Sequence, residues 1–185
     1  MTRLSQLCDL LTGAPEEAAP RLLGAHIVSR VGGGEVRLRI NEVEAYKGED
    51  DPASHAYRGE TTRNASMFRR PGTLYVYRSY GIHNCANAAA GPEGVGWGIL
   101  IRGGEIVDGR GLAVKRRGRE TDLADGPGKL CQALGITLDL NGTDLLADDS
   151  VVRLEDGEPP VMVMATPRVG ISQARDVPWR FVSAS

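Results

Sequence analysis

Alternating apolar and polar positions predict strands in both halves of the chain. Gly32-Gly33-Gly34 interrupts the first apolar pattern and would join the strands on either side of it as a hairpin. Pro71-Gly72 is a turn signal before a run rich in β-branched and aromatic residues, which predicts a second hairpin. The predicted strands are 25–31, 36–44, 73–77, 82–90, 151–154, 161–165 and 179–182.

Helical periodicity and stop signals predict helices around these strands. The first eleven residues have an amphipathic rhythm, and a short helix is expected between Pro15 and Gly24. Three further helices are predicted at 62–68, at 108–117 before Gly118 and at 127–134 before Gly135. The elements do not alternate as regular βαβ units, and 185 residues suffice for one sizeable core. We therefore predict a single α+β domain over 1–185 with a mainly antiparallel sheet.

Charge is unevenly distributed along the chain, although the formal net charge is only −2. Between positions 54 and 87 the only acidic residue is Glu60, and the basic residues are Arg58, Arg63, Arg69, Arg70 and Arg78. Of the 22 basic residues in the chain only three are Lys, and arginine suits bidentate phosphate contacts. A localised basic face is predicted, although arginine-rich codon usage explains the same bias equally well.

Several classes of chemistry have no supporting motif. Cys8, Cys85 and Cys131 lack a second Cys or His at the spacing of zinc sites. Gly126-Pro-Gly-Lys129 does not have the spacing of a phosphate loop, and no Gly-x-Ser-x-Gly elbow occurs. No apolar run reaches the ~20 residues that a membrane span requires. We expect a reduced, cytoplasmic protein without metal, cofactor or membrane contact.

One predicted strand combines an apolar row with two carboxylates. Strict alternation would place Val36, Leu38, Ile40, Glu42 and Glu44 on one face. A carboxylate at the edge of a core must be hydrogen-bonded, ion-paired or shifted in pKa, and such a group can act as a base. A structural ion pair with an arginine is the alternative interpretation.

All five tyrosines lie between positions 46 and 80, interleaved with the arginine-rich segment. Their rings would sandwich an extruded base while the arginines hold the flanking phosphates. A tyrosine-rich core is the alternative, because Tyr75 and Tyr77 alternate with the core-like Leu74 and Val76.

A series of motifs covers nearly the whole chain. They are Asn41-Glu-Val-Glu-Ala-Tyr46, His55, Arg63-Asn64, Met67-Phe68, Pro71-Gly-Thr-Leu-Tyr-Val-Tyr-Arg-Ser-Tyr-Gly81, Cys85-Ala-Asn87, Ile99-Leu-Ile-Arg102, Gly126-Pro-Gly-Lys-Leu-Cys-Gln-Ala-Leu134 and Arg168-Val-Gly170. Together they resemble the alkyladenine (3-methyladenine) DNA glycosylase family. The resemblance implies a curved, mainly antiparallel sheet, surrounding helices and a β-hairpin that inserts into DNA.

The resemblance also implies roles for single residues. Glu44 matches the general base that activates a water for attack on the sugar carbon, and Arg102 matches the arginine that helps to hold that water and Glu44. Tyr80 matches the wedge that fills the space vacated by the flipped base.

Further matches concern the base pocket and the DNA backbone. The pocket residues are Tyr46, His55, Tyr77 and Asn87, and Asn87 screens against the amino group of normal guanine. The candidate backbone contacts are Arg63, Lys129 and Arg168.

The function implied is base-excision repair by a monofunctional purine DNA N-glycosylase. It would flip alkylated or deaminated purines out of double-stranded DNA and leave an abasic site, as a cytoplasmic, prokaryotic-type monomer associated with the nucleoid during repair. A non-catalytic binder of distorted DNA or RNA is the alternative, because stacking needs the same basic and aromatic features. The presence of Glu44 and Arg102 together favours catalysis, and Tyr80 argues against a hydrolase of free nucleosides.

Overall fold

An antiparallel sheet organises the described part of the chain. The computed structural model describes residues 3–184, and side chains from residue 6 onward. The sheet has eight strands in the order β3-β4-β5-β2-β1-β6, while β8 also pairs with β2 and β7 pairs with β8. The strands are β1 (His26–Ser29), β2 (Val36–Lys47), β3 (Leu74–Ser79), β4 (His83–Ala90), β5 (Trp97–Asp108), β6 (Val152–Glu155), β7 (Met162–Thr166) and β8 (Arg180–Ala184).

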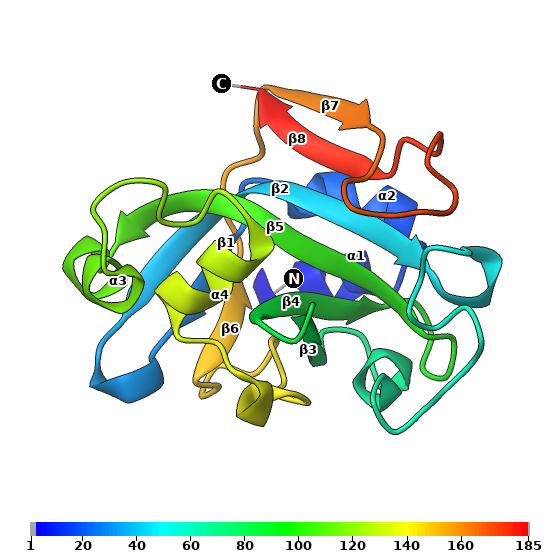
Figure 1. The fold of residues 1–185 in the computed structure, drawn as a ribbon, viewed down its shortest axis with the longest axis horizontal. Coiled ribbons are helices and arrows are strands. Elements are labelled where there is room, and N and C mark those ends of the chain that lie inside the picture. Colours follow the sequence, from blue (N-terminus) through cyan, green and yellow to red (C-terminus); the bar gives the residue numbers. More distant parts are fainter. Residues whose placement is uncertain (1–2, 185) are drawn as a thin grey trace.

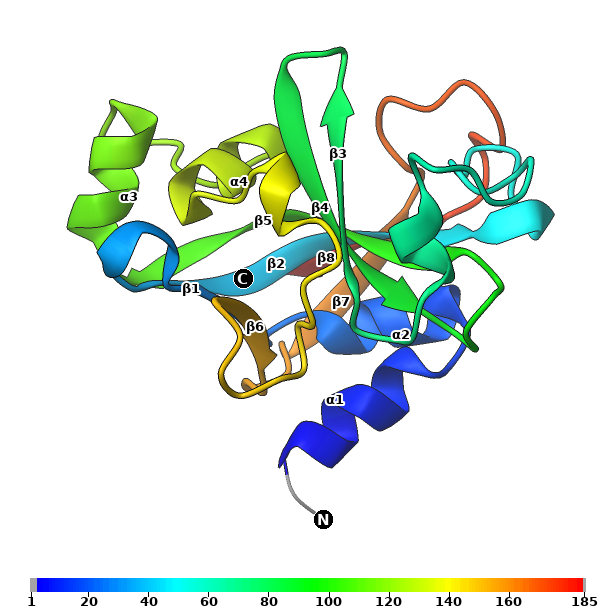
Figure 2. The same cartoon turned by 90° about the horizontal axis from the view of Figure 1, so that it is seen from below.

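Helices cover both faces of this curved sheet. They are α1 (Arg3–Leu11), α2 (Pro15–Leu22), α3 (Arg110–Arg117) and α4 (Pro127–Leu134). Helices α1 and α2 lie on one face, whereas α3 and α4 lie on the other (Figures 1 and 2). One cluster of buried apolar side chains joins the helices to the sheet, and it includes Leu11, Leu22, Ile99 and Leu130. The predicted α+β class with a mainly antiparallel sheet and surrounding helices is confirmed.

The glycine stop signals mark real helix ends. Gly118 and Gly135 adopt left-handed backbone conformations with φ of 67° and 70°. Their N–H groups bond carbonyls of the preceding turn, as expected for glycine at the end of a helix. Helix α3 nevertheless begins at Arg110 rather than 108, because β5 continues through Asp108.

The helix predicted at 62–68 is wrong, since only a 3-10 turn over Ala65–Phe68 forms there. The side chain of Asn64 explains the difference. Its oxygen accepts hydrogen bonds from the backbone N–H and the hydroxyl of Thr61, while its amide donates to the carbonyls of His55 and Gly59. These side-chain bonds hold the segment as a loop and replace helical backbone bonds.

The predicted face of β2 is also wrong beyond Ile40. Register shifts against β5 occur on both sides of Glu42, so the strict alternation breaks. Ile40 and Val43 both lie in the core, and Glu44 consequently points to the opposite face. Gly104 of β5 permits this irregularity, because an added Cβ would lie 2.1 Å from the Leu38 side chain.

Truncation of an apolar side chain should lower the free energy of unfolding in the core of the sheet, but not at the projecting β3–β4 hairpin. Ile99 is fully buried, so Ile99→Ala should lower the free energy of unfolding by roughly 2 to 5 kcal/mol in urea denaturation. Ile82 is 74% exposed at the hairpin, so Ile82→Ala should change it by less than about 0.5 kcal/mol. Equal losses for the two variants would contradict this division.

Candidate active site

The β3–β4 hairpin projects from the body of the molecule on the side of α3 and α4 (Figure 2). At its tip the Tyr80 side chain is 88% exposed, and Ile82 is exposed as well. Tyr80 has a positive φ of 49°, a conformation that a residue with an aromatic side chain rarely adopts. A bond from the Ile82 N–H to the Ser79 carbonyl (3.0 Å) closes the turn. The turn therefore presents an aromatic ring to solvent at the end of a projecting hairpin.

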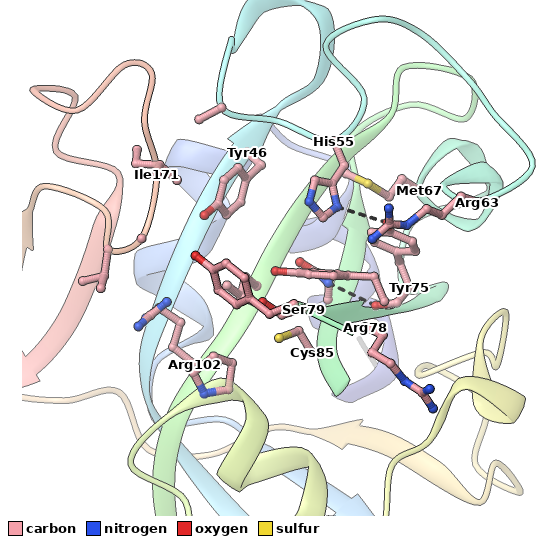
Figure 3. Close-up of a pocket in the computed structure, with 18 of the residues that line it drawn as sticks. Tyr46, His55, Arg63, Met67, Tyr75, Arg78, Ser79, Cys85, Arg102 and Ile171 are labelled. Atoms are coloured by element: carbon pink, nitrogen blue, oxygen red, sulfur yellow. Dashed lines mark hydrogen bonds between the residues drawn. The ribbon is translucent and has the colours of Figure 1, made fainter. Parts of the chain in front are cut away.

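A cavity of about 490 Å³ opens beside this hairpin. It lies between the hairpin, strands β2 and β5, the loop after β2 and the loop after β7 (Figure 3). The structure brings most of the predicted site residues together along its wall, namely Tyr46, Arg63, His55, Tyr77, Tyr80, Asn87 and Arg102. Residues 169–172 close the side next to Tyr46.

Aromatic rings form one wall of the cavity. The rings of His55 and Tyr77 meet edge to face with 4.4 Å between centroids, and Tyr75 stacks on Tyr77 at 5.7 Å. The Tyr75 hydroxyl lies 3.1 Å from His55 Nδ1. Desolvation and the nearby charge of Arg63 lower the pKa of His55, which favours the neutral imidazole near pH 7. Burial raises the pKa of Tyr75 to about 12, so its hydroxyl keeps its proton.

Tyr75 was not among the predicted pocket residues, although its position is recoverable from the sequence. It alternates with Leu74 and Val76, both of which lie in the core, and this period puts it on the face of Tyr77. The Tyr75 carbonyl also accepts a hydrogen bond from the side-chain amide of Asn87 (3.1 Å). This bond fixes the buried Asn87 side chain at the cavity. The core interpretation holds for Tyr75, whose side chain is buried, and the same residue also lines the cavity.

Glu44 has no exposed surface and lies behind the cavity wall. The Tyr46 hydroxyl donates to its Oε2 (2.7 Å), and the backbone N–H of Val169 donates to its Oε1 (2.8 Å). Arg102 Nη1 is 3.5 Å from the same Oε1. Burial, and then the negative charge of Glu44, raise the pKa of Tyr46, so its phenol remains a neutral donor. All three partners line the cavity, and they shield the carboxylate from it.

Glu42 lies next to this group and forms a structural ion-pair cluster. One of its oxygens accepts from Arg102 Nε (2.8 Å) and from Arg180 Nε (2.6 Å). Burial alone would raise the pKa of Glu42, but the hydrogen bonds from both arginines outweigh it and lower the pKa. Burial likewise disfavours the charged form of Arg102, yet the two carboxylates raise its pKa. Arg102 is thus held as a cation between Glu42 and Glu44.

The three predicted backbone contacts have different surroundings. Arg63 is exposed at the cavity, and Lys129, on the first turn of α4, forms an ion pair with Asp125 (2.8 Å). Arg168 is not placed to contact DNA, because its side chain is fully buried. It forms a bidentate ion pair with Asp51, at 2.5 and 2.9 Å. The expectation for Arg168 is therefore wrong, and its guanidinium has a partner inside the protein.

Two further findings concern metal sites and membrane-spanning helices. Among residues 3–184, no three side chains of His, Cys, Asp or Glu are grouped so that they could hold a metal ion. Over the same described residues, no helix has the length and apolarity that crossing a membrane requires.

Comparison with known proteins identifies the family. Residues 9–185 match the family model of methylpurine-DNA glycosylases. A protein of Rhodococcus jostii is 51% identical, with 90% of this chain and 76% of the relative covered. Proteins of Mycobacterium tuberculosis and Nocardia farcinica are 50% and 48% identical, each over 90% of this chain and over 83% and 82% of their own lengths. All three relatives carry the name "putative 3-methyladenine DNA glycosylase". The chain belongs to the methylpurine-DNA glycosylase family, and it is a DNA N-glycosylase of base-excision repair.

Proposed function

We propose that the protein flips alkylated or deaminated purines out of double-stranded DNA and hydrolyses the N-glycosidic bond with a water activated by Glu44. The observation that carries this proposal is a carboxylate held by two hydrogen bonds and one arginine ion pair directly behind the wall of an aromatic cavity. An exposed tyrosine on a projecting hairpin stands beside the cavity opening. A flipped base needs a pocket, and the gap that it leaves in the base stack needs a side chain to occupy it.

The chemistry requires both a base and a negative charge. A purine is a poor leaving group, so positive charge develops on the sugar as the bond breaks. In our proposal Glu44 accepts a proton from the attacking water and its charge stabilises the developing cation. Arg102, fixed by Glu42, orients the water together with Glu44. The product is an abasic site with the DNA backbone intact.

We assign the selection of the substrate base to the aromatic rings of the cavity and to the side-chain amide of Asn87. Tyr46, His55 and Tyr77 would stack on and surround the flipped purine, and Asn87 would screen against the 2-amino group of normal guanine. The direct test uses end-labelled duplexes that contain hypoxanthine, 3-methyladenine, 7-methylguanine or ethenoadenine. Alkali after incubation converts abasic sites into breaks, so release of any of these bases supports the proposal and release of none overturns it.

One observation favours a non-catalytic binder of distorted nucleic acid as the second candidate. Glu44 has no exposed surface, because Tyr46, Arg102 and Val169 lie between it and the cavity. Catalysis therefore requires a water to reach Glu44 past these groups when a base is bound. The alkali assay separates the two candidates, since a binder would retain lesion duplexes without producing breaks.

The paired carboxylates allow a matched test of mechanism. Glu44→Gln keeps the shape and loses the charge, so single-turnover base release should fall by about 10² to 10⁴-fold while lesion binding persists. Glu42→Gln, on the same strand but bonded to arginines rather than to the cavity wall, should lose less than about tenfold. Base release by a folded Glu44→Gln protein within about tenfold of the parent would show that the base is misassigned.

Tyr80 should act as a wedge in the duplex. Loss of aromatic stacking costs roughly 1 to 3 kcal/mol, so Tyr80→Ala should weaken lesion binding by that amount in a Glu44→Gln background. The Tyr80→Ala substitution should not change the thermal stability appreciably, because the Tyr80 ring is almost entirely exposed. Tyr57→Ala removes another exposed ring that does not line the cavity, and it should bind like the parent. Equal binding by the Tyr80 and Tyr57 variants would contradict the wedge.

Base release should need neither a metal nor an amine nucleophile. None of the three lysines lines the cavity, and Lys47 and Lys129 are ion-paired with Glu16 and Asp125. We expect full activity in EDTA, no DNA adduct after borohydride, and no strand breaks before alkali. Activity that EDTA abolishes and a divalent metal restores, or a trapped adduct, would refute this expectation.

A further inference from the structure

Arg168 is a buried charge that the proposed reaction does not use. A guanidinium taken out of water costs several kcal/mol unless it is well paired. Here Asp51 binds it bidentately, and its Nη1 also donates to the Ala45 carbonyl (2.9 Å). Buried ion pairs are weak sources of net stability, because apolar residues of similar volume often replace them without loss. A role for the Arg168–Asp51 pair in fixing the local geometry explains its burial better than a contribution to stability does.

The surroundings of Arg168 show what it fixes. Its guanidinium carbon lies 4.7 Å from the ring centre of Tyr46 and 5.3 Å from that of Trp179. Cation–π contacts of this kind attract the guanidinium to the ring face and favour this packing. Ala45, whose carbonyl accepts from Arg168, stands in β2 between Glu44 and Tyr46. Arg168 therefore ties the strand that carries the catalytic carboxylate to the loop that follows β7.

Both of the neutral donors to Glu44 depend on this tie. The first is the Tyr46 hydroxyl, whose ring packs on the guanidinium. The second is the N–H of Val169, the next residue along the chain from Arg168. Each donor holds a different oxygen of Glu44, so together they determine the orientation of the carboxylate. A displacement of about 1 Å in a catalytic group can lower a rate about 10²-fold.

We propose that Arg168, paired with Asp51, is a positioning residue that sets the orientation of Glu44 through Tyr46 and the Val169 N–H. It touches neither base nor sugar. The inference rests on the proposed function of Glu44, and it replaces the DNA contact expected from the sequence.

The test separates positioning from simple structural support. In Arg168→Met, single-turnover base release should fall about 10²-fold, while binding to lesion duplex changes by less than about tenfold. This variant leaves Asp51 buried without its partner, so some loss of stability is expected as well. The Asp51→Asn/Arg168→Met double variant removes both charges and should recover stability, yet base release should stay slow. Arg168→Lys keeps one charge without the bidentate geometry and should restore the rate only in part.

Arg116→Met provides the matched control. Arg116 also donates to backbone carbonyls, those of Val31 and Ala133, but it does not line or support the cavity. Its loss should lower stability and leave the rate of base release unchanged. Recovery of the parental rate in the double variant, or an equal slowing by Arg116→Met, would overturn the positioning role.

A readout independent of activity keeps this inference distinct from the proposed function. Amide hydrogen exchange should show a protected Val169 N–H in the parent and fast exchange in Arg168→Met. Unchanged protection would reject the positioning role even if the enzyme is slow. A parent protein that releases no damaged purine would instead reject the proposed function.

Discussion

The burial of the Glu44 carboxylate is the constraint on which the site depends. A carboxylate without water contact is costly unless hydrogen-bond donors surround it. Its partners come from three separate parts of the chain: Tyr46 in β2 and Val169 after β7 donate hydrogen bonds, and Arg102 in β5 pairs with it as a cation at 3.5 Å. The site can form only when these parts are brought together, and its geometry is therefore a property of the whole fold.

The sheet meets this constraint through an irregularity. If β2 kept strict alternation after Ile40, Glu44 would point into the apolar core with Ile40. The register shifts around Glu42 turn Glu44 and Tyr46 toward the cavity and return Val43 and Ala45 to the core. The same region places Glu42 between two arginines, which compensate its burial. The bulge that turns Glu44 toward the cavity therefore lies at Glu42, and the ion pairs of Glu42 with Arg102 and Arg180 form at the same point of β2.

The start of helix α4 packs against the hairpin close to its turn. Pro127, at the start of α4, lines the cavity, and the adjacent Gly128 packs against His83 at the start of β4. An added Cβ at Gly128 would lie 2.8 Å from the His83 Cβ, so glycine is required for this close approach. Helix α4 therefore contacts the hairpin next to the turn that carries Tyr80, while the Tyr80 side chain itself remains exposed.

The sequence was informative wherever local rules decide the structure. Period-2 runs and glycine stop signals identified seven of the eight strands and α4, but they did not predict β5 (Trp97–Asp108). Long-range effects explain the errors. The face of Glu44 depends on a bulge against β5, the loop at Asn64 depends on bonds to His55 and Gly59, and the burial of Arg168 depends on distant Asp51. Most of the residues that the family motifs single out line one cavity, although their spacing along the chain could not reveal this.

Tyr46 connects recognition of the base to access of water in the proposed mechanism. Its ring lines the cavity where a flipped purine would stack, and its hydroxyl occupies one oxygen of Glu44. The Arg168 guanidinium packs on the same ring. A bound base that seats against this ring would admit a water to Glu44 only at the moment when a substrate is present. Undamaged bases that fail to seat against the ring would leave the carboxylate covered, and selection would then act on the chemical step as well as on binding.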